Sequence, residues 1–82
     1  MDAANFDKAL KTLSRRSPFR PFVVELVSGD RFEVAHPEAL VFRDGYAFYL
    51  NPEGDWSFFD YEGVAQIVGW INGRKPGSKK KT

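Results

Sequence analysis

The sequence predicts one small, mainly β domain with a short N-terminal helix and five antiparallel strands. Apolar residues recur at helical spacing only near the N-terminus. From residue 22 onward they alternate in short runs, as strands with one buried face do. Glycine-containing turns separate these runs. We expect a strongly bent five-stranded barrel, and an open antiparallel sheet with one helix is the alternative.

The helix is predicted from one apolar stripe that contains Phe6 and Leu10. Asp2 or Asn5 can cap its first turn. Its end is expected before Ser17-Pro18, because a residue that precedes proline is disfavoured in helical conformation. A helix of about three turns is marginal alone in water. We therefore expect it to dock on the sheet.

The strands are predicted from five apolar runs, of which the second is long and interrupted. Pro37 lacks the N–H group that a central strand position needs, so we expect a kink at His36-Pro37. A short helical turn is expected over residues 60–63. Tight turns are expected at Ser28-Gly29-Asp30, Arg43-Asp44-Gly45 and Asn51 to Asp55. The runs cover residues 22–27, 31–44, 46–50, 56–59 and 64–70.

Charge divides the chain unevenly. Residues 1–73 hold 7 of the 12 Lys and Arg residues and all 11 Asp and Glu residues, so their net charge is about −4. The remaining five cations lie in residues 74–82. We predict a single domain over residues 1–73 and a disordered basic tail over residues 74–82.

Composition also excludes several classes of protein. The absence of cysteine excludes disulfides and thiolate metal sites. No apolar stretch is long enough to cross a membrane, and the first residues do not resemble a secretory signal. We therefore expect a cytoplasmic protein.

No set of residues indicates catalysis. His36 is the only histidine, and no nucleophile pattern surrounds it. Four carboxylates in the last third are better explained as solvated turns than as a cation site. We predict no enzymatic activity, no cofactor, no metal and no small-molecule substrate. The four carboxylates are Glu53, Asp55, Asp60 and Glu62.

Aromatic residues are too numerous for one small core. The chain has eight Phe, three Tyr and two Trp. Alternation places either Phe48 or Tyr49 outward, and the same holds for Phe58 and Phe59. Surplus rings can form a subunit interface or stack on nucleic-acid bases. We favour an interface, because the body of the chain lacks the cations that accompany base stacking. The candidate interface residues are Trp56, Phe59, Tyr61 and Ile67.

The cations support an alternative function. Arginines near the helix end can contact phosphate, but they also complement the negative end of the helix dipole. The lysine tail can hold nucleic acid only weakly and in a salt-dependent manner. The candidate RNA contacts are Arg15, Arg16, Arg20, Lys79, Lys80 and Lys81.

The order of elements resembles the Sm-like family, and within it the bacterial Hfq RNA chaperones. Val27-Ser28-Gly29-Asp30 is similar to the family's first turn, and residues 31–44 match its long bent second strand. Residues 60–63 and the following Val64 to Val68 are similar to its helical link and last strand. The resemblance covers roughly residues 5–71. It implies a bent barrel and assembly into a homo-oligomeric ring through strand edges.

One departure affects function. The bacterial family carries a Tyr-Lys-His signature that contacts RNA, and the matching segment here is Phe59-Asp60-Tyr61-Glu62. Two acids in place of two basic residues repel phosphate. We therefore predict a non-enzymatic module for self-assembly or protein interaction. An atypical RNA-binding Sm-like protein is the alternative.

Overall fold

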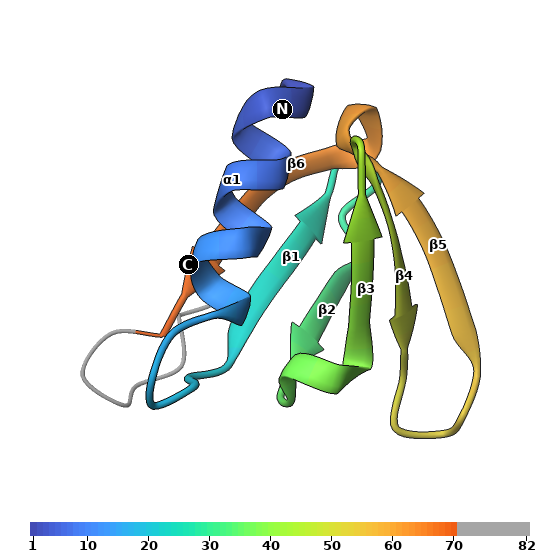
Figure 1. Ribbon diagram of the computed structural model, residues 1–82. Helices are drawn as coiled ribbons and strands as arrows, with labels where there is room; N and C mark the ends of the chain where they lie inside the picture. Colours follow the sequence, from blue (N-terminus) through green and yellow to red (C-terminus); the bar gives the residue numbers. More distant parts are fainter. Residues whose placement is uncertain (71–82) are drawn as a thin grey trace, which may run out of the picture.

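The computed structural model describes residues 1–70, so the predicted basic tail at residues 74–82 lies outside the described part. Within residues 1–70 the chain forms one α-helix and six strands (Figure 1). Two single-turn 3-10 helices, η1 (Pro37–Ala39) and η2 (Tyr61–Gly63), connect strands. The other elements are α1 (Ala3–Ser14), β1 (Phe22–Leu26), β2 (Arg31–Val34), β3 (Leu40–Arg43), β4 (Tyr46–Leu50), β5 (Trp56–Asp60) and β6 (Val64–Gly69).

The strands form two antiparallel sheets of three strands each, in the orders β2-β1-β6 and β3-β4-β5. The predicted closed barrel is therefore not observed, and the alternative of open antiparallel sheets with one helix fits. The physical reason lies at η1. The run expected as one bent strand over residues 31–44 is broken by η1, with Pro37 at its start, and the chain passes from one sheet to the other.

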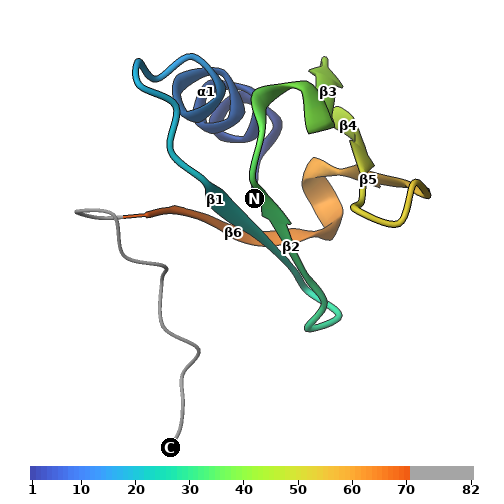
Figure 2. The same cartoon turned by 90° about the horizontal axis from the view of Figure 1, so that it is seen from below.

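Helix α1 joins the two sheets. The Asp2 side chain caps it by accepting a hydrogen bond from the backbone N–H of Asn5 at 2.8 Å. Phe6 and Leu10 are fully buried. The helix contacts β3 of one sheet and β6 of the other. In the view from below, α1 and the two sheets surround one interior (Figure 2).

The turn between β3 and β4 is held from both sides. Asp44 and Gly45 have φ angles of 52° and 90°, which are the left-handed values that an Asp-Gly hairpin turn requires. The Gly45 N–H donates to the Asp7 carboxylate at 2.9 Å, and the Gly45 carbonyl accepts from the Tyr61 N–H at 2.8 Å. These contacts fix the end of the β3-β4 hairpin against α1 and η2.

The core lies between the sheets and is built on aromatic rings. Phe6 meets Phe59 edge to face at 6.1 Å between ring centroids, and Phe32 packs on Phe59 at 5.7 Å. Phe32 also packs on Tyr49 at 5.1 Å. The Tyr49 hydroxyl donates to the carbonyl of Glu33 in β2 at 2.8 Å, so one side chain joins the two sheets.

No helix in residues 1–70 has the length and apolar character needed to cross a membrane.

Candidate functional site

The outer surface of the β3-β4-β5 sheet carries large apolar side chains that nothing covers within residues 1–70. We call this surface the aromatic face. Trp56 and Phe58 are 58% and 61% exposed, and Phe48 and Tyr46 are 43% and 40% exposed. The residues of the aromatic face are Val41, Tyr46, Phe48, Trp56 and Phe58.

Strand register explains why these side chains share one face. Phe48 in the central strand pairs with Val41 on one side and with Phe58 on the other. Their neighbours along each strand, such as Ala47 beside Phe48 and Phe59 beside Phe58, point inward and are buried. Because side chains alternate along a strand, burial of one set fixes the other set outward. Phe48 and Phe58 are thus the outward members of the two pairs that the sequence left open.

The rings of the aromatic face support one another. Phe48 lies 5.0 Å from Phe58 and 6.4 Å from Trp56 between centroids, and Tyr46 lies 6.0 Å from Phe58. Each aromatic side chain offers roughly 150–250 Å², so four rings exposed by about half present about 400 Å² of aromatic surface. That size falls in the range of the largest apolar patch on a typical monomer, and such patches often serve in binding.

Opposite charges lie at one end of the aromatic face. Tyr46 pairs in register with Arg43 on β3 and with Asp60 on β5, so the three residues form a row across the sheet. Arg43 lies 3.6 Å from Asp44, and both side chains are about 80% exposed. Asp60 accepts a hydrogen bond from the Gly63 N–H with Oδ1 at 3.1 Å and so caps η2. A positive and a negative group therefore stand on opposite sides of Tyr46.

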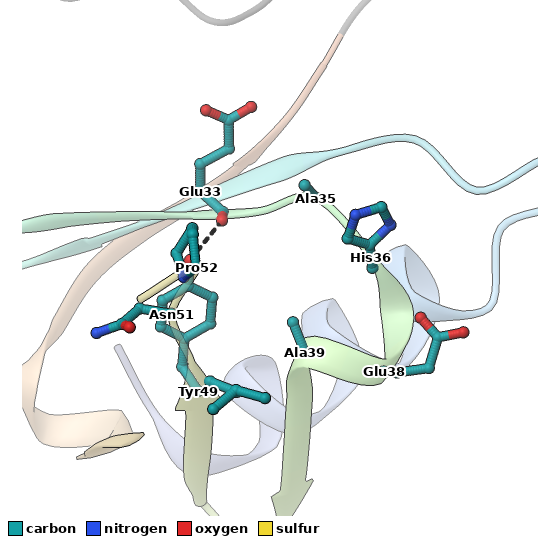
Figure 3. Close-up of a pocket in the computed structure, with 9 residues that line it drawn as sticks. Glu33, Ala35, His36, Glu38, Ala39, Tyr49, Asn51 and Pro52 are labelled. Carbon is teal, nitrogen blue, oxygen red and sulfur yellow. Dashed lines mark hydrogen bonds between the residues drawn. The ribbon is translucent and has the colours of Figure 1, made fainter. Parts of the chain in front are cut away.

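A cleft of about 400 Å³ lies beside η1, between the end of β2 and the end of β4 (Figure 3). Its walls are mostly apolar, and the Glu33 side chain points away from the Tyr49 ring. Burial raises the pKa of Tyr49 above 10.0, and the charges of Glu33 and then Glu53 raise it further. The cleft is lined by Glu33, Ala35, His36, Glu38, Ala39, Tyr49, Leu50, Asn51 and Pro52.

The cleft offers little for catalysis. His36 is its one histidine, and no serine, lysine or cysteine lines it. In the part of the chain that the structure describes, no group of three His, Asp or Glu residues is placed to hold a metal ion. What the cleft presents is an apolar hollow with acidic groups at its rim.

No family model, curated protein or solved structure matches the chain.

The structure separates the four candidate interface residues. Trp56 lies on the aromatic face, whereas Phe59 is 6% exposed and belongs to the core. Tyr61 and Ile67 are half-buried and pack against the core. The assignment of these four residues to a subunit interface stays a prediction. The candidates did not include four residues of the aromatic face: Val41, Tyr46, Phe48 and Phe58. Strict alternation from a buried Ala47 is the signal that could have found those on β4.

The candidate RNA contacts lie elsewhere. Arg15, Arg16 and Arg20 are exposed at the end of α1 and in the connector to β1. This region lies across the molecule from β5 in both views (Figures 1 and 2). Lys79, Lys80 and Lys81 fall outside the described residues. The three described arginines and the aromatic face therefore do not form one surface.

Proposed function

We propose that this chain is a non-enzymatic module for protein interaction or self-assembly, and that the aromatic face is its binding surface. The observation that carries the proposal is the exposure of four rings on one sheet, each in contact with at least one other. Tyr, Trp and Phe are enriched at the centres of protein interfaces. Burying such a patch against a partner stabilises the complex through the hydrophobic effect.

We further propose that the fold is Sm-like in layout. When β2 and β3 are taken as two halves of one bent strand interrupted at η1, the chain has a helix, then five strands, with a helical turn before the last. The order β2-β1-β6 beside β3-β4-β5 supports this layout. Edge pairing into a ring remains part of the proposal, because β5 and β6 each have one unpaired edge among the described strands.

RNA binding is the less favoured alternative. Exposed rings on a sheet can stack on bases, but such surfaces combine stacking with cations that neutralise phosphate. Arg43 is the one cation of the β3-β4-β5 sheet. Asp44 lies 3.6 Å from it, and Asp60 lies in the same row across the sheet. A shift assay with single-stranded oligonucleotides, at low and at moderate salt, tests this alternative. Binding that survives deletion of residues 74–82 and is lost with the aromatic face would favour it.

The test of the proposed function compares the wild type with F48S/F58S, which removes two exposed rings. Both proteins are measured by sedimentation equilibrium and are used as targets for selection from a displayed peptide library. We expect self-association or selected peptides that depend on the wild-type face. Ala65→Ser is the control, because Ala65 is an exposed apolar residue of β6, outside the β3-β4-β5 sheet.

The proposed function is wrong if the wild type neither self-associates nor selects a peptide whose binding F48S/F58S abolishes. Melting temperatures of all three proteins are compared to confirm folding. Cross-strand ring pairs contribute roughly 0.2–1 kcal/mol each, so the double variant should remain folded.

A further inference from the structure

We propose that the partner of the aromatic face is a second copy of this chain, packed face to face about a two-fold axis that runs along β4. This inference rests on the proposed function and names its partner. The proposed dimer differs from assembly through strand edges, because its interface is the outer face of the β3-β4-β5 sheet and its two-fold symmetry closes at two copies. The register of β3, β4 and β5 carries the inference.

The outward side chains form three rows across the sheet. The first row is Arg43, Tyr46 and Asp60, and the second is Val41, Phe48 and Phe58. The third pairs Leu50 with Trp56, beyond the point where β3 begins. Each row has a member on β4, the central strand.

A two-fold axis along β4 keeps every row opposite the same row of the other copy and exchanges the β3 side with the β5 side. Arg43 then faces Asp60 of the second copy, and Asp60 faces its Arg43. Val41 faces Phe58, while Tyr46 and Phe48 each face their own equivalents. A two-fold interface requires such self-complementarity, in which each contact occurs twice.

The other face-to-face two-fold arrangement is worse. An axis across the strands would place the row of Arg43 and Asp60 against the row of Leu50 and Trp56. Asp60 would then lie against Trp56 of the second copy, and Arg43 would lie over the side where that row has no β3 member. Neither charge would meet an opposite charge, which is costly for the covered Asp60. Charge complementarity therefore selects the axis along β4.

The two charged groups are free to make these contacts. The Arg43 side chain is 82% exposed, and its only ion pair within residues 1–70 is the one with the equally exposed Asp44. Asp60 uses Oδ1 for Gly63, and the structure shows no hydrogen bond to Oδ2 from residues 1–70. Packed sheets lie about 10 Å apart with strands crossing at about 30°, a spacing that the long Arg43 side chain can bridge.

The size of the face predicts a weak dimer. Two copies cover roughly 800 Å² of aromatic surface in total, below the ~1,200 Å² at which stable interfaces begin. We expect a dissociation constant of about 100 µM, as in transient complexes. The first measurement is sedimentation equilibrium of the full chain at protein concentrations up to about ten times that value. A wild type that stays monomeric over this range overturns the inference.

Charge exchange tests the orientation. R43E sets a carboxylate against Asp60 of the other copy twice per dimer, and D60K sets an ammonium group against Arg43 twice. The dissociation constant of the dimer should therefore rise about tenfold or more for each variant alone. In an equimolar mixture, a heterodimer of R43E with D60K pairs opposite charges at both contacts, so dimerisation should return. Arg31→Glu makes the same charge change on β2, away from the face, and should leave the dissociation constant unchanged.

Cross-linking tests the axis without charge exchange. The chain has no cysteine, so Tyr46→Cys introduces a single thiol next to the proposed axis. A short bis-maleimide should link two Y46C chains, whereas T12C, with its thiol at an exposed position of α1, should not cross-link. In an edge-paired assembly, β4 of one copy lies at least three strand spacings, ~14 Å, from β4 of the next. The Y46C readout also decides the question if D60K, which removes the cap of η2, fails to fold.

Three outcomes separate the inference from the proposed function. Dimers that Y46C cross-links and that the charge-exchanged mixture restores support both. If the protein forms oligomers that R43E does not weaken and that Y46C does not cross-link, the inference is overturned. Self-assembly as a function is then still supported. A monomer that still selects face-dependent peptides overturns the inference and keeps the aromatic face as a site for another protein.

Discussion

Replacing Tyr49 by Phe should destabilise the domain by breaking the side-chain hydrogen bond from Tyr49 of β4 to the carbonyl of Glu33 in β2. The ring keeps its packing on Phe32, so the change removes the hydroxyl and little buried area. The Glu33 carbonyl loses its 2.8 Å donor but lies beside the cleft, where water can replace it. The loss is therefore that of an ordinary hydrogen bond, about 1 kcal/mol.

That loss is measurable in a domain of this size. A change of ~1 kcal/mol lowers the melting temperature by roughly 4–8 °C in domains of 60–100 residues. Urea unfolding followed by circular dichroism gives the free energy of unfolding. Tyr46→Phe is the matched control, because Tyr46 is 40% exposed, and its effect should stay within about 0.5 kcal/mol.

The same variant has a pH signature. The pKa of Tyr49 is raised above 10.0 by burial and by the charges of Glu33 and Glu53, so the folded state holds this proton more tightly than the unfolded state. The stability that Tyr49 contributes is therefore complete below pH 10.0 and is lost as the pH rises further. The advantage of wild type over Y49F should be constant up to about pH 9 and shrink above about pH 10. Equal stability at pH 8, together with parallel curves to high pH, would refute the reasoning.

Three further substitutions test the turns and the core. Gly45→Ala should cost about 1–3 kcal/mol or more, because its φ is +90° and the new Cβ would lie 3.0 Å from the Tyr61 ring. Gly29→Ala, at a φ of +99° with nothing within 4 Å of the new Cβ, should cost only the backbone strain. If urea unfolding shows a larger loss of stability for Gly29→Ala than for Gly45→Ala, the contact with Tyr61 is contradicted. Phe6→Ala should cost about 3–5 kcal/mol, because Phe6 is fully buried against Phe59; a melting temperature near that of wild type would mean that α1 does not dock as described.

Local signals were enough to predict most of the elements. A cap at Asp2 or Asn5, the Asp44-Gly45 turn and an interruption at His36-Pro37 each depend on the chemistry of a few adjacent residues. The structure shows Asp2 as the cap, confirms the turn and places η1 at the interruption. Closure into a barrel depends on pairing between strands distant in sequence. The sequence does not show that η1 ends one sheet and begins another, so it predicted a barrel where the structure has two open sheets.

The candidate site was predicted only in part for a similar reason. In Phe58-Phe59 both neighbours are large and apolar, so alternation marks two faces without saying which is buried. The packing of Phe59 on Phe6 and Phe32 decides this, and those partners come from α1 and β2. Trp56 was predicted at an interface and is exposed, although its partner remains to be tested.

The pairing of β1 with β6 has a consequence for how the chain folds during synthesis. Phe22 pairs with Gly69, and α1, which is made before any strand, contacts β6. The ribosome therefore releases α1, β1 and β2 long before the strand that completes their sheet exists. Until residue 69 emerges, the edge of β1 that pairs with β6 has no partner strand, and the helix lacks part of its docking surface. We expect nascent chains that stop before β6 to be protease-sensitive, and protection to appear abruptly once that strand leaves the exit tunnel.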